Sequence, residues 1–488
     1  MLRIYQVNTA TWLHSLSAQA NLPITLADIP DSAVDLISQL GVNCVWLMGV
    51  WERSPAGRQI ALTHPDLQKE YTRALPNVQP SDVAGSPYCI RGYSVDPMFG
   101  TAADLASFRK RLANRGMKLI LDFVPNHVAV DHPWVETHPE YLLQALPEVA
   151  QADTSTFFQA PGGAFFAHGK DPYFPAWTDT LQVNAFHPQL RRATISTLLS
   201  IAAQCDGVRC DMAMLLTSAV FSKTWGKIAS NPPAVDYWEE IIPSVKSAFP
   251  NFTFMAEVYW DLEWQLIQQG FNFAYDKRLY DRLLHESAGS IRAHLQADLT
   301  YQSHLVRFLE NHDEPRAMVT FGPERVRAAA ILISTLPGAL ILHEGQELGH
   351  RIKLPVQLHR RPVESSDLNL RDFYQNLLTK WAAPTYPPST YHSIPATPHP
   401  FQPNGHQELI AHSYHHQNRA RLVVVNWSNR HVQGYLPLGH LPLSGDTVTL
   451  LDQLTGIVYT RNVPDLRSPG LHVILAPWQA HVFEIAAA

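Results

Sequence analysis

The chain has 488 residues, of which 46% are hydrophobic, and a formal net charge of −6. This length and hydrophobic content allow a large buried core and exclude a small peptide, so we expect more than one domain. The mild negative charge, without a long run of Lys or Arg, excludes the electrostatic footprint of a protein that binds nucleic acid or an anionic membrane.

The start of the chain and its cysteines indicate a cytoplasmic location. Residues 1–9 lack the basic start, apolar middle and cleavage site of a secretory signal. The longest apolar region, residues 328–342, contains Pro337 and Gly338 and cannot span a bilayer as a continuous helix. Four cysteines are too few for a disulfide scaffold and lack paired metal-ligand spacing. We therefore expect a soluble protein with reduced, buried thiols.

Short apolar runs recur along the first three quarters of the chain. Residues 3–9, 44–48 and 119–123 are of the kind found in strands that are buried on both faces, as in a parallel sheet. Five further strands are expected to begin near Gly207, Phe252, Phe271, Val306 and Ala339.

Helix-like segments alternate with these strands. Residues 31–40 carry apolar side chains at helical spacing and end at Gly41. Thr101 is a suitable N-cap for a helix over residues 102–114. Eight strands in strand, helix, strand order predict a closed (β/α)8 TIM barrel.

Two regions interrupt the alternation. Residues 128–184 are rich in Pro, His, Gly and aromatic residues without a clear period, which predicts a small excursion domain beside the active cleft. After a Pro-rich stretch at 383–400, five strand-like runs predict a C-terminal antiparallel β-sandwich without helices. The expected domains are therefore the barrel (1–127 and 185–385), the excursion (128–184) and the C-terminal domain (386–488).

Three acids follow predicted strands and should meet at the carboxyl edge of the barrel, where barrel enzymes hold their active sites. Asp211 lies two residues after Arg209, so their side chains share one strand face, and we expect the Arg to lower the carboxylate pKa. Glu257 has apolar neighbours that favour a protonated acid, and Asp313 could steady positive charge in a transition state. Taken singly, each could be an ordinary ion pair.

Four other side chains are candidates for substrate contact. His127 and His312 each follow an Asn near a predicted strand end, and neutral imidazoles can donate hydrogen bonds to sugar hydroxyls. Tyr88 and Trp260 could stack on a sugar ring, although packing within a loop is an equally good reading of each.

The chain resembles the α-amylase family of glycoside hydrolases in its motifs and their order. The matching segments are 122–127 (Asp-Phe-Val-Pro-Asn-His), 207–211 (Gly-Val-Arg-Cys-Asp), Glu257 at a strand end and 310–313 (Glu-Asn-His-Asp), with support from 95–101 and 337–347.

This resemblance implies a fold and a set of roles. It implies a (β/α)8 barrel with an excursion after the third strand and a C-terminal β domain. It also implies a retaining mechanism on α-glucosidic bonds, with Asp211 as nucleophile, Glu257 as acid/base and Asp313 as transition-state stabiliser. In the family, positions that match Tyr88, His127, Arg209 and His312 line the subsite of the sugar being cleaved.

The sequence departs from many relatives at three places. Met214 and Leu215 stand where starch-cleaving members often have a Lys-His pair, and Gly92 stands where many have Asp. Residues 181–184 lack the Asp that serves as a calcium ligand, and Asn126 alone cannot supply the six or more oxygens that calcium takes. We therefore expect no cofactor and no bound metal.

The expected function is hydrolysis of α-glucans or small α-glucosides. Transfer to a sugar or to phosphate is the alternative, because the same glycosyl-enzyme intermediate serves each reaction. A non-catalytic carbohydrate-binding barrel and a zinc-dependent barrel hydrolase are the remaining hypotheses. A carbohydrate is the only expected partner, and the sequence does not indicate the oligomeric state.

Overall fold

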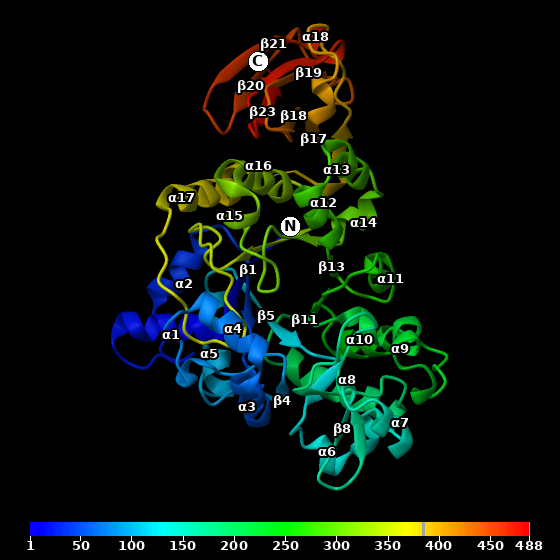
Figure 1. The fold of residues 1–488 in the computed structure, drawn as a ribbon. Helices are drawn as coiled ribbons and strands as arrows, with labels where there is room; N and C mark the ends of the chain where they lie inside the picture. Colours follow the sequence, from blue (N-terminus) through cyan, green and yellow to red (C-terminus); the bar gives the residue numbers. More distant parts are fainter. Residues whose placement is uncertain (383–385, 488) are drawn as a thin grey trace.

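The computed structural model describes residues 1–382 and 386–487, and its centre is a closed barrel of eight parallel strands (Figure 1). Neighbouring strands follow the order β1-β15-β14-β13-β12-β11-β5-β2. The last strand closes on the first, with Leu2 opposite Ala339. The expected barrel is therefore confirmed. Its strands are β1 (Leu2–Asn8), β2 (Cys44–Met48), β5 (Lys118–Phe123), β11 (Gly207–Cys210), β12 (Thr253–Ala256), β13 (Phe273–Tyr275), β14 (Leu305–Arg307) and β15 (Ala339–His343).

The strands form where the sequence offers residues that can be buried on both faces. All residues of β2 and β11 are buried, between the barrel interior and an outer layer of helices. That layer includes α1 (Thr9–Ala20), α2 (Asp31–Ser38), α5 (Ala102–Ala113), α8 (Pro188–Ala202), α10 (Tyr237–Ala248), α12 (Lys277–His285) and α16 (Gly322–Ser334).

The helix boundaries follow local capping signals. The Thr101 hydroxyl accepts a hydrogen bond from the Asp104 N–H, which caps α5 as the sequence predicts. Gly41 and Gly116 have φ values of +78° and +73°, which only glycine adopts readily, and they end the predicted helices.

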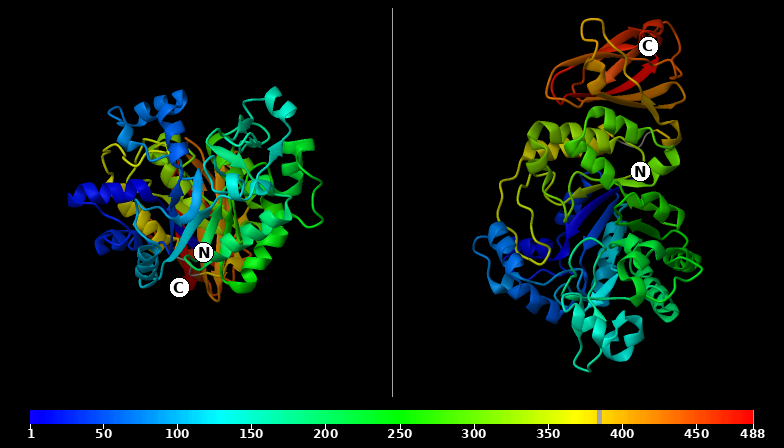
Figure 2. Two further views of the ribbon diagram at one scale, coloured as in Figure 1. Left: turned by 90° about the horizontal axis from the view of Figure 1, so that it is seen from below. Right: turned by 45° about the vertical axis from the view of Figure 1, so that its right-hand side comes forward.

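Two insertions rise at the carboxyl end of the barrel. The excursion holds a β6–β10 pair (His127–Ala129 with Thr180–Gln182), a sheet of β7 (Gln144–Ala145), β9 (Phe165–Ala167) and β8 (Phe157–Gln159), and short helices α6 (Trp134–Thr137) and α7 (Pro147–Ala152). The second insertion, α3 (Pro55–Thr63) with α4 (Pro65–Ala74), was not predicted. Figure 2 (left) shows the two standing on opposite sides, in cyan and blue.

The C-terminal region is an antiparallel β domain, as predicted. Its six-stranded sheet has the order β16-β17-β18-β23-β20-β21, and β19 pairs with β22. The expectation that no helix intervenes is wrong, because α18 (Val463–Arg467) forms one short turn after β21. The strands are β16 (His392–Ile394), β17 (Leu409–His416), β18 (Arg419–Asn426), β19 (Val432–Leu436), β20 (Thr447–Asp452), β21 (Val458–Asn462), β22 (Leu471–Leu475) and β23 (Ala480–Ala487).

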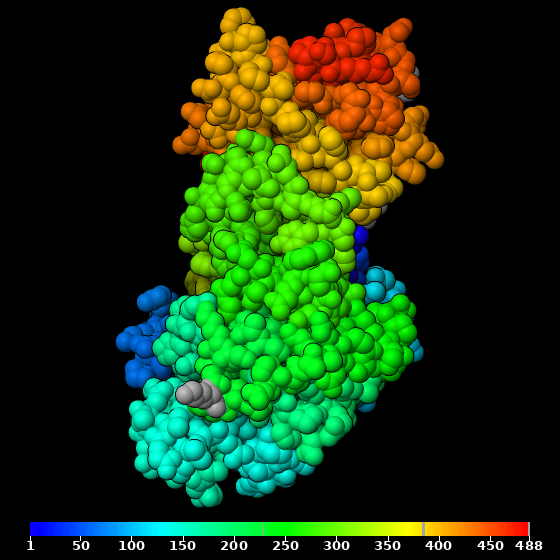
Figure 3. All heavy atoms as spheres, turned by 90° about the vertical axis from the view of Figure 1, so that its right-hand side faces the viewer, coloured from blue at the N-terminus to red at the C-terminus, as the bar shows by residue number. Residues whose placement is uncertain are grey.

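This domain docks on the barrel through one face of its sheet. Along β18, Val423 and Val425 join the core of the barrel, whereas Leu422 and Val424 join a separate core inside the domain, as strand alternation dictates. Figure 3 shows excursion, barrel and C-terminal domain stacked in that order. The domain boundary expected between 385 and 386 falls beside residues 383–385, which lie outside the described residues.

Two features concern the cellular setting. All four cysteines are buried and none forms a disulfide, in agreement with the expected buried thiols. Among the described residues, the helices are too short or too polar to cross a membrane.

Candidate active site

The three acids lie at the carboxyl end of the barrel. Asp211 directly follows β11 and Glu257 directly follows β12, and these two strands are neighbours in register. Backbone hydrogen bonds continue the pairing beyond the strands: the Asp211 N–H donates to Phe123 and the Glu257 N–H donates to Cys210, at 2.8 and 3.0 Å. Asp313 lies in the loop after β14. Adjacent parallel strands therefore place two of the three carboxylates side by side.

The Arg209 guanidinium lies within ion-pair distance of all three acids. Its Nη1 lies 2.6 Å from Oδ1 of Asp211, and its Nη2 lies 2.8 Å from Oε2 of Glu257 and 3.9 Å from Oδ2 of Asp313. Arg209 is fully buried. The structure thus brings Arg209 and Asp211 together, as expected for side chains two apart on one strand. Glu257 contacts the other Nη atom of the same guanidinium.

The pKa values of Glu257 and Asp313 are shifted in opposite directions. Burial raises the pKa of Glu257 to about 7, although Arg209 opposes the shift. Desolvation would also raise the pKa of Asp313, but His312, Arg209 and Lys353 outweigh it and hold that pKa well below its usual range. Glu257 is therefore suited to carry a proton near neutral pH while Asp313 is ionised.

Arg209 lowers the pKa of Asp211, as expected. Burial raises that pKa by more, so the net shift is upward. The sequence shows the Arg two residues away, but it does not show that the carboxylate is almost completely enclosed.

Two further groups contact Glu257. The Tyr259 hydroxyl donates to Oε1 of Glu257 and the Met212 N–H donates to Oε2, each at 2.7 Å. Met212 has a φ of +43°, unusual for a residue with a side chain, and this conformation accompanies its N–H contact with the acid. Sequence reasoning missed both groups, although the position of Tyr259 two residues after the acid was a usable signal.

His312 and Tyr88 meet beside Asp313. Their rings stack at 5.3 Å, and the Tyr88 hydroxyl lies 2.7 Å from Nε2 of His312. The same Nε2 lies 3.0 Å from Oδ2 of Asp313. On the other side of the ring, Nε2 of Gln6 lies 2.7 Å from Nδ1 of His312. Gln6 on β1 was not predicted, because only closure of the barrel brings it to the loop after β14.

His127 lies farther out, at the base of the excursion. Its ring faces Trp177 at 5.2 Å and is buried. Burial lowers its pKa to about 4, so the imidazole is neutral at neutral pH, as a donor to sugar hydroxyls should be. Near the same motif, Asp122 accepts hydrogen bonds from Trp46 Nε1 and the Gly49 N–H, at 3.1 and 2.7 Å, which fixes the end of β5.

The oxygens of Asn126 already have protein donors. Nε2 of Gln182 lies 2.8 Å from the Asn126 carbonyl oxygen and 3.0 Å from its side-chain oxygen. An amide donor therefore sits where calcium would need to approach these oxygens, so the residues present do not fit a calcium site here. Over the described residues, no group of three or more His, Cys, Asp or Glu side chains is arranged to hold a metal ion.

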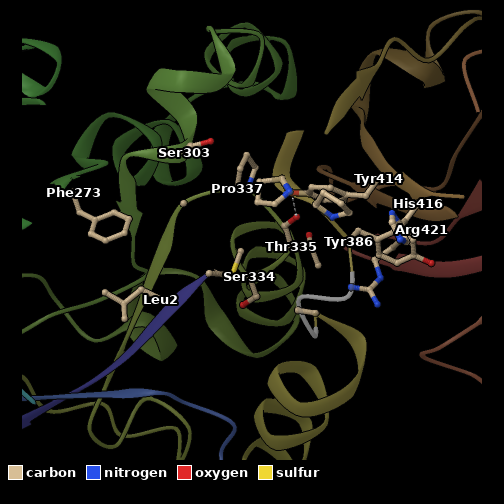
Figure 4. Close-up of a pocket in the computed structure, with 15 residues that line it drawn as sticks. Leu2, Phe273, Ser303, Ser334, Thr335, Pro337, Tyr386, Tyr414, His416 and Arg421 are labelled. Carbon is tan, nitrogen blue, oxygen red and sulfur yellow. Dashed lines mark hydrogen bonds between the residues drawn. The ribbon is translucent and has the colours of Figure 1, made fainter. Parts of the chain in front are cut away.

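A separate pocket of about 540 Å³ lies at the opposite end of the barrel (Figure 4). It is lined by Leu2 and Phe273, the first residues of β1 and β13, and by Tyr414 of the C-terminal domain. It is remote from the acids and belongs to the contact between barrel and C-terminal domain.

Comparison with known proteins gives consistent matches. The family model for the α-amylase catalytic domain matches residues 31–369. The α-amylase MalA of Haloarcula japonica is 24% identical over 433 residues, covering 83% of this chain and 53% of MalA. The α-amylase 3 of Dictyoglomus thermophilum is 23% identical over 318 residues, covering 60% of this chain and 59% of that protein. The chain thus spans between half and two thirds of the length of these relatives.

The fold also matches a solved structure. The noncanonic maltogenic α-amylase AmyB from Thermotoga neapolitana superposes with a TM-score of 0.68 at 18% identity, covering 100% of this chain and 99% of AmyB. At this identity, the likeness concerns the arrangement of the chain in space.

Proposed function

Because the chain belongs to the α-amylase family, we propose that it is a retaining glycoside hydrolase that acts on α-glucosidic bonds of α-glucans or small α-glucosides. One observation carries the proposal: Arg209 holds Asp211 and Glu257 at 2.6 and 2.8 Å, while burial gives Glu257 a pKa of about 7. A short separation between two carboxylates favours attack by one of them over attack by water.

In the first step, Asp211 attacks the anomeric carbon and forms a covalent glycosyl ester. The bond between that carbon and the glycosidic oxygen breaks, and Glu257 gives its proton to this oxygen as the leaving sugar departs. Arg209 holds Asp211 in place through the 2.6 Å contact. Asp313 is ionised and faces the positive charge that develops on the sugar ring.

In the second step, Glu257 takes a proton from water and the oxygen of that water bonds to the anomeric carbon. The ester bond to Asp211 then breaks, which restores both carboxyl groups. Tyr88 and His312 would contact the bound sugar beside Asp313, and His127 would contact it from the excursion side. If a sugar hydroxyl or phosphate replaces the water, the same intermediate gives transfer.

Product analysis tests this proposal. The protein is incubated with maltooligosaccharides, sucrose and trehalose, with and without phosphate, and the products are separated by chromatography. We expect reducing sugars of retained configuration and a loss of at least about 1,000-fold in Asp211→Asn, because the attacking group is removed. Asp281→Asn, on the outer helix α12, is the matched control and should keep full activity. Hydrolysis that persists in Asp211→Asn would overturn the mechanism.

We also propose that activity needs no calcium, because Gln182 engages the oxygens of Asn126. Activity and melting temperature should be unchanged by a chelator and by added calcium. A loss of activity on chelation that calcium restores would contradict this.

A further inference from the structure

Gln6 is a fully buried amide beside His312. It belongs to β1 and pairs in register with Trp46 of β2 and His343 of β15, so neighbouring strands fix its backbone on both sides. Its Nε2 lies 2.7 Å from Nδ1 of His312 and 3.7 Å from Sδ of Met48. The amide nitrogen therefore contacts one ring nitrogen of His312 and the sulfur of Met48.

The thioether of Met48 favours one orientation of the Gln6 amide. A thioether sulfur accepts hydrogen bonds but cannot donate one, so it favours the NH2 group of the amide over the amide oxygen. Both hydrogens of Nε2 then have an acceptor, Sδ of Met48 and Nδ1 of His312. The reversed amide would place its oxygen against the sulfur. The observed orientation is kept although Oε1 of Gln6 has no hydrogen-bond partner among the described residues.

The hydrogen bond from Gln6 determines which nitrogen of His312 carries the proton. A ring nitrogen that accepts from an amide must offer its lone pair, so the proton of the neutral ring is on Nε2. This nitrogen lies 3.0 Å from Oδ2 of Asp313 and 2.7 Å from the Tyr88 hydroxyl oxygen, and both oxygens can accept. The hydroxyl hydrogen of Tyr88 is then available to a bound sugar.

We propose that Gln6, oriented by Met48, is a positioning residue that keeps His312 neutral with its proton on Nε2. A donor at Nδ1 opposes the uptake of a second proton there, whereas the Asp313 carboxylate favours it. A neutral ring leaves the negative charge of Asp313 to stabilise the positive charge on the sugar, which an imidazolium would offset. This inference rests on the proposed function and extends it.

Ionisable groups of both signs lie around His312 and Asp313. They come from β5, β11, β15 and the neighbouring loops, and they are Asp122, Arg209, His343, Lys353 and Tyr88. Because all of these groups remain when Gln6 is replaced, a change in the protonation of His312 reports the loss of the amide.

Gln6→Met tests the amide with a side chain of similar length. Loss of the donor lets Nδ1 take up a proton, so kcat/KM on maltooligosaccharides should begin to fall at a higher pH on the acid side. We call this fall with decreasing pH the acid limb, and we expect it to shift upward by about one pH unit. Met48→Leu should shift it in the same direction by less, because the amide can then turn. Lower activity at every pH with the acid limb in place would overturn the inference.

Gln269→Met is the matched control. Gln269 directly follows α11 (Glu263–Gln268) and is also a buried glutamine. Its Nε2 donates to Oδ2 of Asp236 at 2.9 Å, and its Oε1 has no partner in the part of the chain that the structure describes. We expect Gln269→Met to leave the acid limb in place. An equal shift in this variant would mean that the limb reports a general loss of packing, which would also overturn the inference.

Nitrogen NMR of protein labelled with 15N-histidine provides a measurement that needs no turnover. The chemical shift of a ring nitrogen shows whether it carries a proton, and a His312→Asn variant identifies the signals of His312. We expect Nδ1 of the wild type to lack a proton from about pH 8 to about pH 5, and Nδ1 of Gln6→Met to carry one at about pH 5.

The NMR result also separates this inference from the proposed function. The expected signals would support the role of Gln6 even if the protein cleaved none of the substrates, a result that would reject the proposed function alone. A protonated Nδ1 in the wild type at neutral pH, or the same signals in the wild type and in Gln6→Met at every pH, would reject the role of Gln6.

Discussion

The Tyr259 hydroxyl donates a 2.7 Å hydrogen bond to Oε1 of Glu257, a carboxyl group whose pKa burial raises to about 7. A donor of this kind favours the ionised acid, so it opposes the effect of burial. The protonation of Glu257 therefore results from a balance between burial, the hydrogen bonds from Tyr259 and Met212, and the positive charge of Arg209. This balance can be shifted by substitution.

The pH profile of the wild type should show this acid directly. We expect kcat/KM on maltooligosaccharides to fall as pH rises through about 7, because only protonated Glu257 can assist departure of the leaving sugar. Glu257→Gln should lose activity on these substrates but still release fluoride from α-glucosyl fluoride, since fluoride departs without a proton. Steady-state rates of the wild type and of Glu257→Gln, measured over a range of pH, test both expectations. If the Glu257→Gln protein still shows this fall of kcat/KM with rising pH on maltooligosaccharides, which we call the alkaline limb, Glu257 is not the acid.

Tyr259→Phe should shift the alkaline limb of the pH profile to higher pH. Loss of the hydroxyl removes a donor to the ionised carboxylate, so the pKa of Glu257 should rise and the alkaline limb should shift upward by about half a unit to one unit. Tyr301→Phe, whose ring lies against Trp264, is the control and should leave the limb in place. A lower kcat with an unmoved limb would mean that Tyr259 only supports the loop.

Glu347 should make stability depend on pH. It is buried, accepts hydrogen bonds from the Tyr5 hydroxyl at 2.7 Å and the Gly345 N–H at 3.0 Å, and burial raises its pKa from 4.5 to about 7. The folded protein thus binds this proton more tightly than the unfolded chain. The resulting stabilisation is complete below pH 4.5 and is lost as pH rises through about 7, a change of about 3 kcal/mol in the free energy of unfolding.

Glu347→Gln removes this titration. We expect the melting temperature of the wild type to fall more between pH 5 and pH 8 than that of the variant. Glu324→Gln, at an exposed position of α16, should behave as the wild type. Parallel curves for Glu347→Gln and the wild type would contradict the prediction.

The C-terminal domain should contribute stability without affecting catalysis. The Tyr414 hydroxyl donates to the Thr335 carbonyl at 2.9 Å, at the end of the barrel opposite the acids. Tyr414→Phe should lower the free energy of unfolding by about 1 kcal/mol and leave kcat unchanged. Denaturant titration and kinetics measure the two effects, and Tyr459→Phe inside the same domain is the comparison. A changed kcat in Tyr414→Phe would show coupling between the two ends of the barrel.

Sequence reasoning located the strands and acids because both depend on local patterns. A wholly apolar run at 44–48 is sufficient to identify β2, and an acid after such a run must lie at the carboxyl edge. Gln6 and Asp211 show what local patterns do not predict, because both depend on contacts between distant segments. The contact of Gln6 with His312 joins residues 306 apart, and the pKa of Asp211 depends on enclosure by many segments. The α3–α4 insertion was not predicted, and its two helices are short and each begins at a proline.

Closure of the barrel also has a consequence for synthesis on the ribosome. β1 emerges first, yet one of its two partner strands is β15, more than three hundred residues later. Until β15 has emerged, β1 presents an open sheet edge, which is prone to pairing with other chains. Glu344 and Gln6 are joined by a backbone hydrogen bond of 2.9 Å, so the final pairing also positions the strand whose Gln6 supports His312. The nascent chain should therefore gain the complete site only when the barrel closes.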